Sequence, residues 1–283
     1  MVVRQAQADS PVLTWSLLGR SPSELRVTTD GREVPVDWAW GGADGRGVRV
    51  CVLDSGVAGD HPMVGEVQAS FMVRVEDEEA VVEECEPEDL SGHGTACAGI
   101  IRRLAPECEL HSVRVIGKNK RGTGTALLAG LEWAIAQGFD VISMSLSTPQ
   151  MNYFSDLHRL ADEAHFRRSV LVASAPNRRG ESFPWRFASV ISVGSHREND
   201  PDLVLSNPQP PVDFFAHGQN VLVPWFRGGT VRMTGNSFAT PYVAGLCARI
   251  LSKHPALTVV QLKNILYMTA ANVLPAPLEV TSD

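Results

Sequence analysis

The stretch Gly235-Asn236-Ser237-Phe238-Ala239-Thr240-Pro241 decides the fold, together with two shorter blocks that precede it in the chain. The first block is Val52-Leu53-Asp54-Ser55-Gly56, and the second is Ser91-Gly92-His93-Gly94-Thr95. In this order the blocks supply a carboxylate, an imidazole and a hydroxyl, which are the three groups of an acid-base-nucleophile triad. The sequence therefore predicts a hydrolytic site built from three separate segments.

Each of the three candidate residues also has an ordinary structural explanation when it is taken alone. Asp54 could end a strand in a turn, His93 could be a structural imidazole, and Ser237 could cap a helix. The three in this order favour catalysis instead. We expect Asp54 to orient His93, His93 to act as general base, and Ser237 to act as nucleophile.

Apolar, β-rich runs alternate with helical patterns along most of the chain. The runs that predict strands lie at 48–53, 111–115, 141–146, 170–174 and 190–193. The patterns that predict helices lie at 94–104, 125–137, 156–168, 237–251 and 259–269. Strands separated by helices of this length predict an α/β fold, with a mainly parallel central sheet and helices on both faces.

The order Asp, His, Ser is that of subtilisin and differs from the orders of chymotrypsin and the α/β-hydrolases. Over roughly 47–270 the chain resembles the subtilisin-like serine proteases, the subtilases, in its Asp-Ser-Gly, His-Gly-Thr and Ser-Phe-Ala-Thr-Pro motifs. The resemblance implies a serine endopeptidase that works through an acyl-enzyme. It also implies an oxyanion hole formed by Asn177, which follows the predicted strand at 170–174, and by the Ser237 N–H.

The same resemblance implies where a substrate lies. A peptide or protein substrate in extended conformation would pair as an added strand with Ser145, Leu146 and Ser147. The pocket beside the cleaved bond would have this segment as one wall and Ala173, Ser174 and Ala175 as the other. These side chains are small, so we expect an open pocket.

Three residues depart from the family's motifs, namely Ser147 and Pro176 in place of Gly and Asn236 in place of Thr. Pro176 restricts its neighbours and could shift the Asn177 amide. A catalytically silent peptide-binding module is the alternative function, and the complete triad argues against it. A nucleotide-binding protein is disfavoured, because the glycines at 41–47 and 121–124 do not form a strand-to-helix phosphate loop.

We expect the reaction to need no cofactor and no metal. The segment 95–115 runs directly from helix to strand, without the longer loop that carries calcium in many secreted subtilases. The segment before Asp54 is also too short for the folding prodomain of those enzymes. The simplest division is an N-terminal extension at 1–46, a catalytic domain at 47–272 and a tail at 273–283. Residues 1–40 could be a packed arm or a short inhibitory segment that is removed on activation.

The formal net charge of −7 is concentrated in residues 76–89, which hold nine acidic residues and no basic ones. The run could be a solvated loop, or it could favour basic substrates. The chain shows no basic helix, so nucleic-acid binding is not expected, and no apolar run of the ~20 residues that span a bilayer. The oligomeric state is left open, as is the choice between bulk protein and one precursor peptide as substrate.

The five cysteines lie mostly in apolar or small-residue runs and resemble buried thiols. A bridge between Cys85 and Cys108 is the one pairing left open. Free thiols and the absence of an apolar N-terminal run predict a cytoplasmic location.

Overall fold

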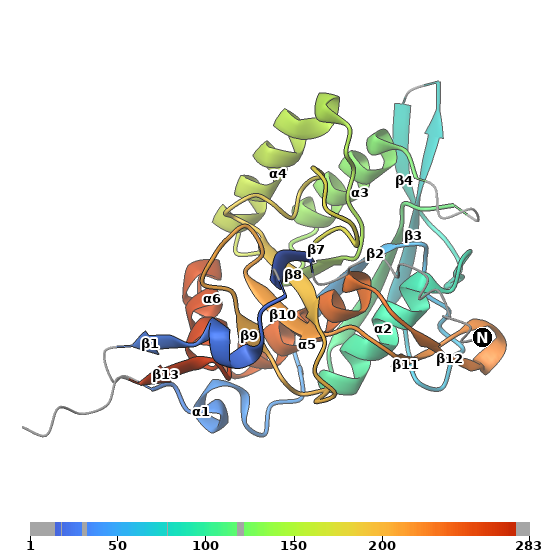
Figure 1. Cartoon of the computed structure of the whole chain (residues 1–283). Helices are drawn as coiled ribbons and strands as arrows, with labels where there is room; N and C mark the ends of the chain where they lie inside the picture. Colours follow the sequence, from blue (N-terminus) through green and yellow to red (C-terminus); the bar gives the residue numbers. More distant parts are fainter. Residues whose placement is uncertain (1–14, 18, 30–32, 78, 118–121, 276–283) are drawn as a thin grey trace, which may run out of the picture.

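The computed structural model describes residues 15–17, 19–29, 33–77, 79–117 and 122–275. Its centre is a nine-stranded sheet in the order β4-β3-β5-β2-β6-β7-β8-β10-β9, with helices on both faces (Figure 1). The strands are β2 (Arg49–Asp54), β3 (Ala69–Glu76), β4 (Glu79–Glu84), β5 (Glu109–Arg114), β6 (Val141–Met144), β7 (Val170–Ser174), β8 (Ile191–His196), β9 (Leu205–Ser206) and β10 (Phe214–His217). The pairs β3–β4 and β9–β10 are antiparallel and the rest are parallel, which confirms the predicted α/β fold.

Two helical layers cover the sheet because successive residues of a strand face opposite sides. Val50 and Val52 of β2 belong to the core under one layer, whereas Cys51 and Leu53 belong to the core under the other. The first layer contains α1 (Val36–Trp40), α2 (His93–Leu104), α5 (Asn236–Lys253) and α6 (Val259–Met268). The second contains α3 (Gly124–Ala136) and α4 (Phe154–Phe166). Strands buried on both faces explain the continuous apolar runs of the sequence.

The five predicted helices form within a few residues of their expected limits. Side-chain caps explain two of the starts, because Thr123 Oγ1 accepts from the Ala126 N–H and Thr258 forms a capping box with Gln261. Pro241 lies inside α5, four residues after Ser237, so its missing N–H leaves the Ser237 carbonyl without its helical partner. The Ser145 hydroxyl and the Cys97 thiol donate to that carbonyl instead.

Two small sheets lie outside the central one. The strands β11 (Val221–Pro224) and β12 (Thr230–Met233) form an antiparallel hairpin that leads into α5. The strands β1 (Val27–Thr29) and β13 (Val273–Pro275) pair in parallel and join the two ends of the described chain (Figure 1). The remaining short helices are η1 (Trp15–Leu17), η2 (Pro22–Leu25), η3 (Met151–Tyr153) and η4 (Phe226–Gly228).

The acidic run is not simply a loop. Residues 79–84 form β4 and pair with β3, while Ala80 and Val82 are partly covered and α3 packs beside the hairpin. Arg74 of β3 lies 3.2 Å from Glu83 across the pair, which offsets part of the acidic charge. Exposure alternates over 79–82, but the residue types, Glu-Ala-Val-Val-Glu-Glu, do not, so the sequence shows no strand period here.

The described helices include none that is both apolar enough and long enough to cross a membrane.

Candidate active site

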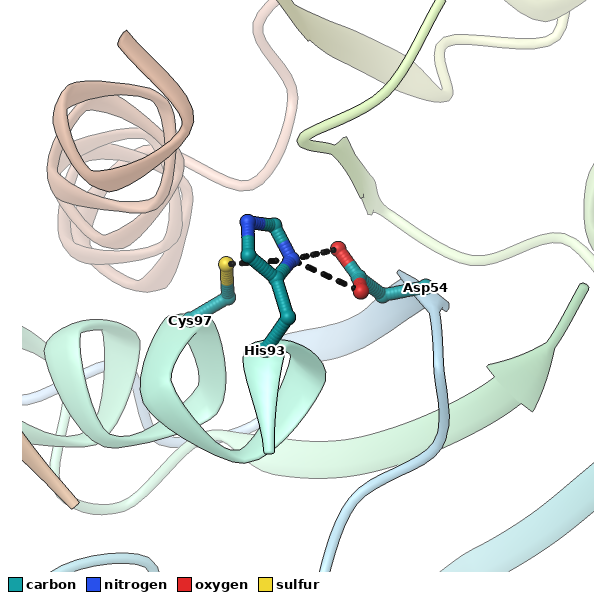
Figure 2. A group of neighbouring side chains, drawn as sticks. All are labelled: Asp54, His93 and Cys97. Atoms are coloured by element: carbon teal, nitrogen blue, oxygen red, sulfur yellow. Dashed lines mark hydrogen bonds and ion pairs between the residues drawn. The ribbon is translucent and has the colours of Figure 1, made fainter. Parts of the chain in front are cut away.

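The carboxylate and the imidazole meet at one edge of the central sheet. Asp54 is the last residue of β2 and is 1% exposed, and His93 is the first residue of α2. The His93 Nδ1 atom lies 2.9 Å from Asp54 Oδ1 and 3.0 Å from Oδ2 (Figure 2). A carboxylate only accepts hydrogen bonds, so Nδ1 donates, and the neutral ring has its lone pair on Nε2. In Figure 2 this second nitrogen points away from Asp54.

Buried hydrogen bonds hold the segment that leads into His93. Asp89 Oδ1 accepts from the Ser55 hydroxyl and from the N–H groups of Ser91 and Gly92, at 2.8–2.9 Å. Its Oδ2 accepts from the Thr95 N–H and hydroxyl, at 2.8 and 2.6 Å. Asp89 therefore binds the Asp54 turn and the start of α2 to each other, although the sequence placed it in the solvated acidic run.

Glycine at position 94 is required by a close approach of two backbones. A Cβ at Gly94 would lie 2.0 Å from the carbonyl oxygen of Gly56 and 3.2 Å from the Asp54 Cβ. The His-Gly-Thr motif thus allows the helix that carries His93 to pack directly on the turn after Asp54.

Ser237 is the second residue of α5 and lies in the same cleft as His93. Its carbonyl accepts a hydrogen bond from the Ser145 hydroxyl at 2.8 Å, and the neighbouring Phe238 ring lies 5.5 Å from the His93 ring. The N–H groups of the first helical turn have no partner within the helix, so the Ser237 N–H is available to a ligand. A cleft of ≈ 440 Å³ contains His93, Ser237 and the predicted oxyanion residue Asn177.

The Asn177 side chain is exposed and has a fixed orientation. Its Oδ1 accepts a hydrogen bond from the Asn236 backbone N–H at 2.9 Å. With Oδ1 occupied, the Nδ2 group is the part of the amide left to donate into the cleft.

Five of the six predicted substrate-contact residues line the cleft: Ser145, Leu146, Ser147, Ser174 and Ala175. Ala173 does not line the cleft, because it is fully buried on β7 and packs in the core between the sheet and the helices α3 and α4. Consecutive strand residues face opposite sides of a sheet, so Ala173 and Ser174 cannot share one wall.

The cleft also contains residues that the sequence analysis did not assign as contacts. Met233 is the last residue of β12, Thr234 follows it, and Phe238 follows Ser237. Their position directly beside the Gly235–Pro241 block is the signal that could have identified them.

The charge of His93 depends on its neighbours. Burial is the largest single effect and opposes the protonated ring, but the charge and hydrogen bond of Asp54, together with the Cys97 sulfur, raise the His93 pKa well above its ordinary value. Cys97 lies one helical turn further on, with its Sγ 4.0 Å from His93 Nδ1 and 3.5 Å from the Ser237 carbonyl oxygen. Burial raises the pKa of the Cys97 thiol, which keeps it protonated.

Asp54, His93 and Cys97 are also a group that could hold a metal, since one ligand atom from each lies within 4.8 Å of the others (Figure 2). The donor set of oxygen, nitrogen and sulfur would suit a soft ion. A metal on His93 Nδ1 would displace the hydrogen bond to Asp54, so metal binding and the triad exclude each other here.

All five cysteines are free, including Cys85 and Cys108, so the one bridge that the sequence left open does not form.

The comparisons with known proteins agree with this geometry. Residues 45–281 match the subtilase family, peptidase S8. Subtilisin DY of Bacillus licheniformis is 31% identical over 247 residues, which cover 82% of this chain and 86% of that protein. Subtilisin BL of Lederbergia lenta is 33% identical over 244 residues, with the same shares covered. A cold adapted subtilisin-like serine proteinase of known structure superposes with a TM-score of 0.65 at 26% identity, covering 86% of this chain and 89% of that one.

These findings define a serine-type endopeptidase that acts on peptide substrates. The chain belongs to the subtilase family.

The predicted cytoplasmic location is wrong, because the subtilisins among the relatives are secreted, extracellular proteases. The prediction depended on an N-terminus without an apolar run and on unpaired cysteines, four of which are buried among apolar neighbours. Buried free thiols of this kind do not identify a compartment.

Proposed function

We propose that Asp54, His93 and Ser237 are the catalytic triad of this endopeptidase. The observation that carries the proposal is the hydrogen bond from His93 Nδ1 to Asp54, at the base of the cleft that also contains Ser237. His93 Nε2 takes the Ser237 proton as the Ser237 oxygen attacks the scissile carbonyl, and then gives that proton to the leaving amine. Water then hydrolyses the acyl-enzyme, with His93 taking a proton from the water and returning it to Ser237. Each of these proton transfers uses a group of the protein.

The oxyanion of the tetrahedral intermediate would lie between the Asn177 Nδ2 group and the Ser237 N–H. Asn177 and Ser237 line the same cleft, and the Asn236 N–H donates to Asn177 Oδ1, which fixes the orientation of the amide. A donor that is already oriented stabilises developing charge without reorganisation.

We place an extended peptide along Ser145, Leu146 and Ser147, with Ser174 and Ala175 as the opposite wall. Strand β6 ends at Met144, so the following three residues leave the sheet and are free to pair with a substrate. Leu146 and Ser147 also line a second cavity of ≈ 360 Å³, beside Ile116 and Leu127. An apolar side chain several residues before the cleaved bond would fit that second cavity.

The first test is labelling with a fluorophosphonate, followed by peptide mapping. The wild type is expected to be modified at Ser237, and Ser237→Ala is expected to lose the label. Ser252→Ala is the matched control, since this serine lies near the other end of α5 and its hydroxyl bonds to the Arg249 carbonyl. Asn177→Ala is expected to lower kcat by about 10²–10³-fold with KM nearly unchanged. A label that persists in Ser237→Ala would contradict the assignment of the nucleophile.

A further inference from the structure

The carbonyl of Pro176 is bound by two side chains that come from different parts of the chain. Trp15 Nε1 donates to it at 2.9 Å, and Asn236 Nδ2 donates to it at 3.0 Å. This carbonyl belongs to the peptide unit that links Pro176 to Asn177. The orientation of that unit sets the direction in which the Asn177 side chain leaves the backbone.

Asn236 connects the same segment to its surroundings on one side. Its side chain is buried, its Nδ2 also donates to the Ala175 carbonyl at 3.2 Å, and its Oδ1 accepts from the Ser195 N–H at 2.9 Å. Its backbone N–H donates to Asn177 Oδ1. The residue that precedes the nucleophile therefore bonds both to the carbonyl of the Pro176–Asn177 peptide unit and to the Asn177 side chain.

Trp15 donates the second hydrogen bond to the Pro176 carbonyl, and its own ring is held by packing. Its ring packs edge-to-face on Trp185, which is 1% exposed, with 6.1 Å between ring centroids. Leu17 and Leu25 of the same arm are buried, and Asn272 Nδ2 donates to the Leu25 carbonyl at 2.7 Å. Trp15 is not among the residues that line the catalytic cleft, so its path to the reaction runs through Pro176.

Proline makes this carbonyl important. Pro176 has no N–H, so the carbonyl is its remaining backbone hydrogen-bonding group. Two donors on one carbonyl restrict rotation of the peptide unit, in the segment where Pro176 could otherwise shift the Asn177 amide.

We propose that Trp15 is a positioning residue for peptide hydrolysis, which acts with Asn236 to fix the Pro176–Asn177 peptide and so the oxyanion donor. The inference rests on the proposed role of Asn177. It assigns the arm formed by residues 15–17 and 19–29 to the active enzyme. Loss of the Trp15 N–H would weaken transition-state binding without removing a substrate contact.

The test is Trp15→Phe, which removes the indole N–H and keeps an aromatic ring against Trp185. We expect kcat to fall about 3- to 10-fold, the effect of one lost hydrogen bond, with KM unchanged within about twofold. The inhibition constant of a peptide boronic acid, which forms a tetrahedral adduct on the nucleophile, should rise by the same factor as kcat falls. Trp38→Phe is the matched control and should change neither constant, because Trp38 is 48% exposed and packs on His254 far from the cleft.

The decisive measurement is the same substitution in the Asn177→Ala background. If Trp15 acts through Asn177, Trp15→Phe should lower kcat in the wild type and have no further effect in Asn177→Ala. An unchanged kcat in the single variant, or an equal fall in both backgrounds, would overturn the inference. An Asn177→Ala variant with wild-type kcat would instead refute the oxyanion assignment itself, so the two failures are distinguishable.

Should Trp15→Phe fail to fold, 3-benzothienylalanine at position 15 replaces it. This residue has the shape of tryptophan and lacks only the N–H donor, so the same outcomes apply to it.

Discussion

At the scale of single residues, the proposed roles of His93 and Ser237 make activity depend on the protonation of His93. Only the neutral imidazole accepts a proton, and the Asp54 carboxylate raises the His93 pKa well above 6.5 against the effect of burial. We therefore expect kcat/KM to rise with pH through an apparent pKa above 6.5. Asp54→Asn should lower kcat by about 10⁴-fold and move the apparent pKa of the residual activity downward.

The measurement is a pH-rate profile from pH 5 to pH 10 for both proteins. His254→Asn is a suitable control, because this ring contacts the Trp38 carbonyl on the surface and not the cleft. An apparent pKa at or below 6.5 in the wild type would show that Asp54 does not stabilise the charged ring.

The placement of Asp54, His93 and Ser237 could be predicted at this scale because each lies at the end of a strand or the start of a helix, within a short contiguous block. Trp15 could not be predicted, since its partner Pro176 is 161 positions away in the sequence. Asp89 was obscured for a different reason. Asp89 accepts five hydrogen bonds, but in the sequence it is one more carboxylate at the end of a run of carboxylates.

At the scale of elements, the turn after β2 and the start of α2 depend on each other through Asp89. Asp89→Asn replaces one acceptor oxygen with an N–H₂ group that faces donors from Ser55 or Thr95. Charge-assisted hydrogen bonds in a buried site are each worth about 1.5–3 kcal/mol. We expect a loss of about 3 kcal/mol or more in the free energy of unfolding, together with reduced kcat, because His93 would no longer be held.

The measurement is urea unfolding, which compares the free energy of unfolding of Asp89→Asn with that of the control Glu86→Gln. Glu86 belongs to the same acidic run and is exposed, so its neutralisation should change stability by less than about 0.5 kcal/mol. Equal small effects in the two variants would mean that the Asp89 network does not hold the helix start.

The five central strands β2, β5, β6, β7 and β8 could be predicted because they are buried apolar runs, and the five long helices because their apolar residues recur at helical spacing. The remaining strands could not. The strands β9 and β1 have two and three residues, which is too short for a period to appear. The strand predicted at 141–146 ends at Met144, because the next three residues leave the sheet and line the cleft. The apolar pattern of the sequence does not show where the chain leaves the sheet.

At the scale of the whole molecule, several buried histidines predict acid sensitivity. Burial, with Arg49 nearby, lowers the pKa of His111 to about 4. Burial also lowers the pKa values of His196 and His217. The unfolded chain binds protons on these rings below about pH 6.5 while the folded protein does not, so stability should fall as the pH drops from 6.5 toward 4.

His93 has the opposite sign and a different window. Its raised pKa contributes stability that is fully present below pH 6.5 and is lost as the pH rises through the folded-state value. Urea unfolding of the wild type and His111→Phe at pH 7 and pH 4.5 separates the effects. The variant should lose less stability between these values, and an identical loss would show that His111 does not contribute.

The edge of the central sheet has a consequence for how folded copies meet in solution. Strand β4 is the last strand at its end of the sheet, so one side of its backbone faces no neighbour in the sheet order. Such an edge can template pairing with a second chain. Here Glu79, Glu83 and Glu84 occupy that strand, and two copies joined edge to edge would bring glutamates close to glutamates. Repulsion between them disfavours growth into extended β-assemblies, and added salt weakens this protection by screening the charges.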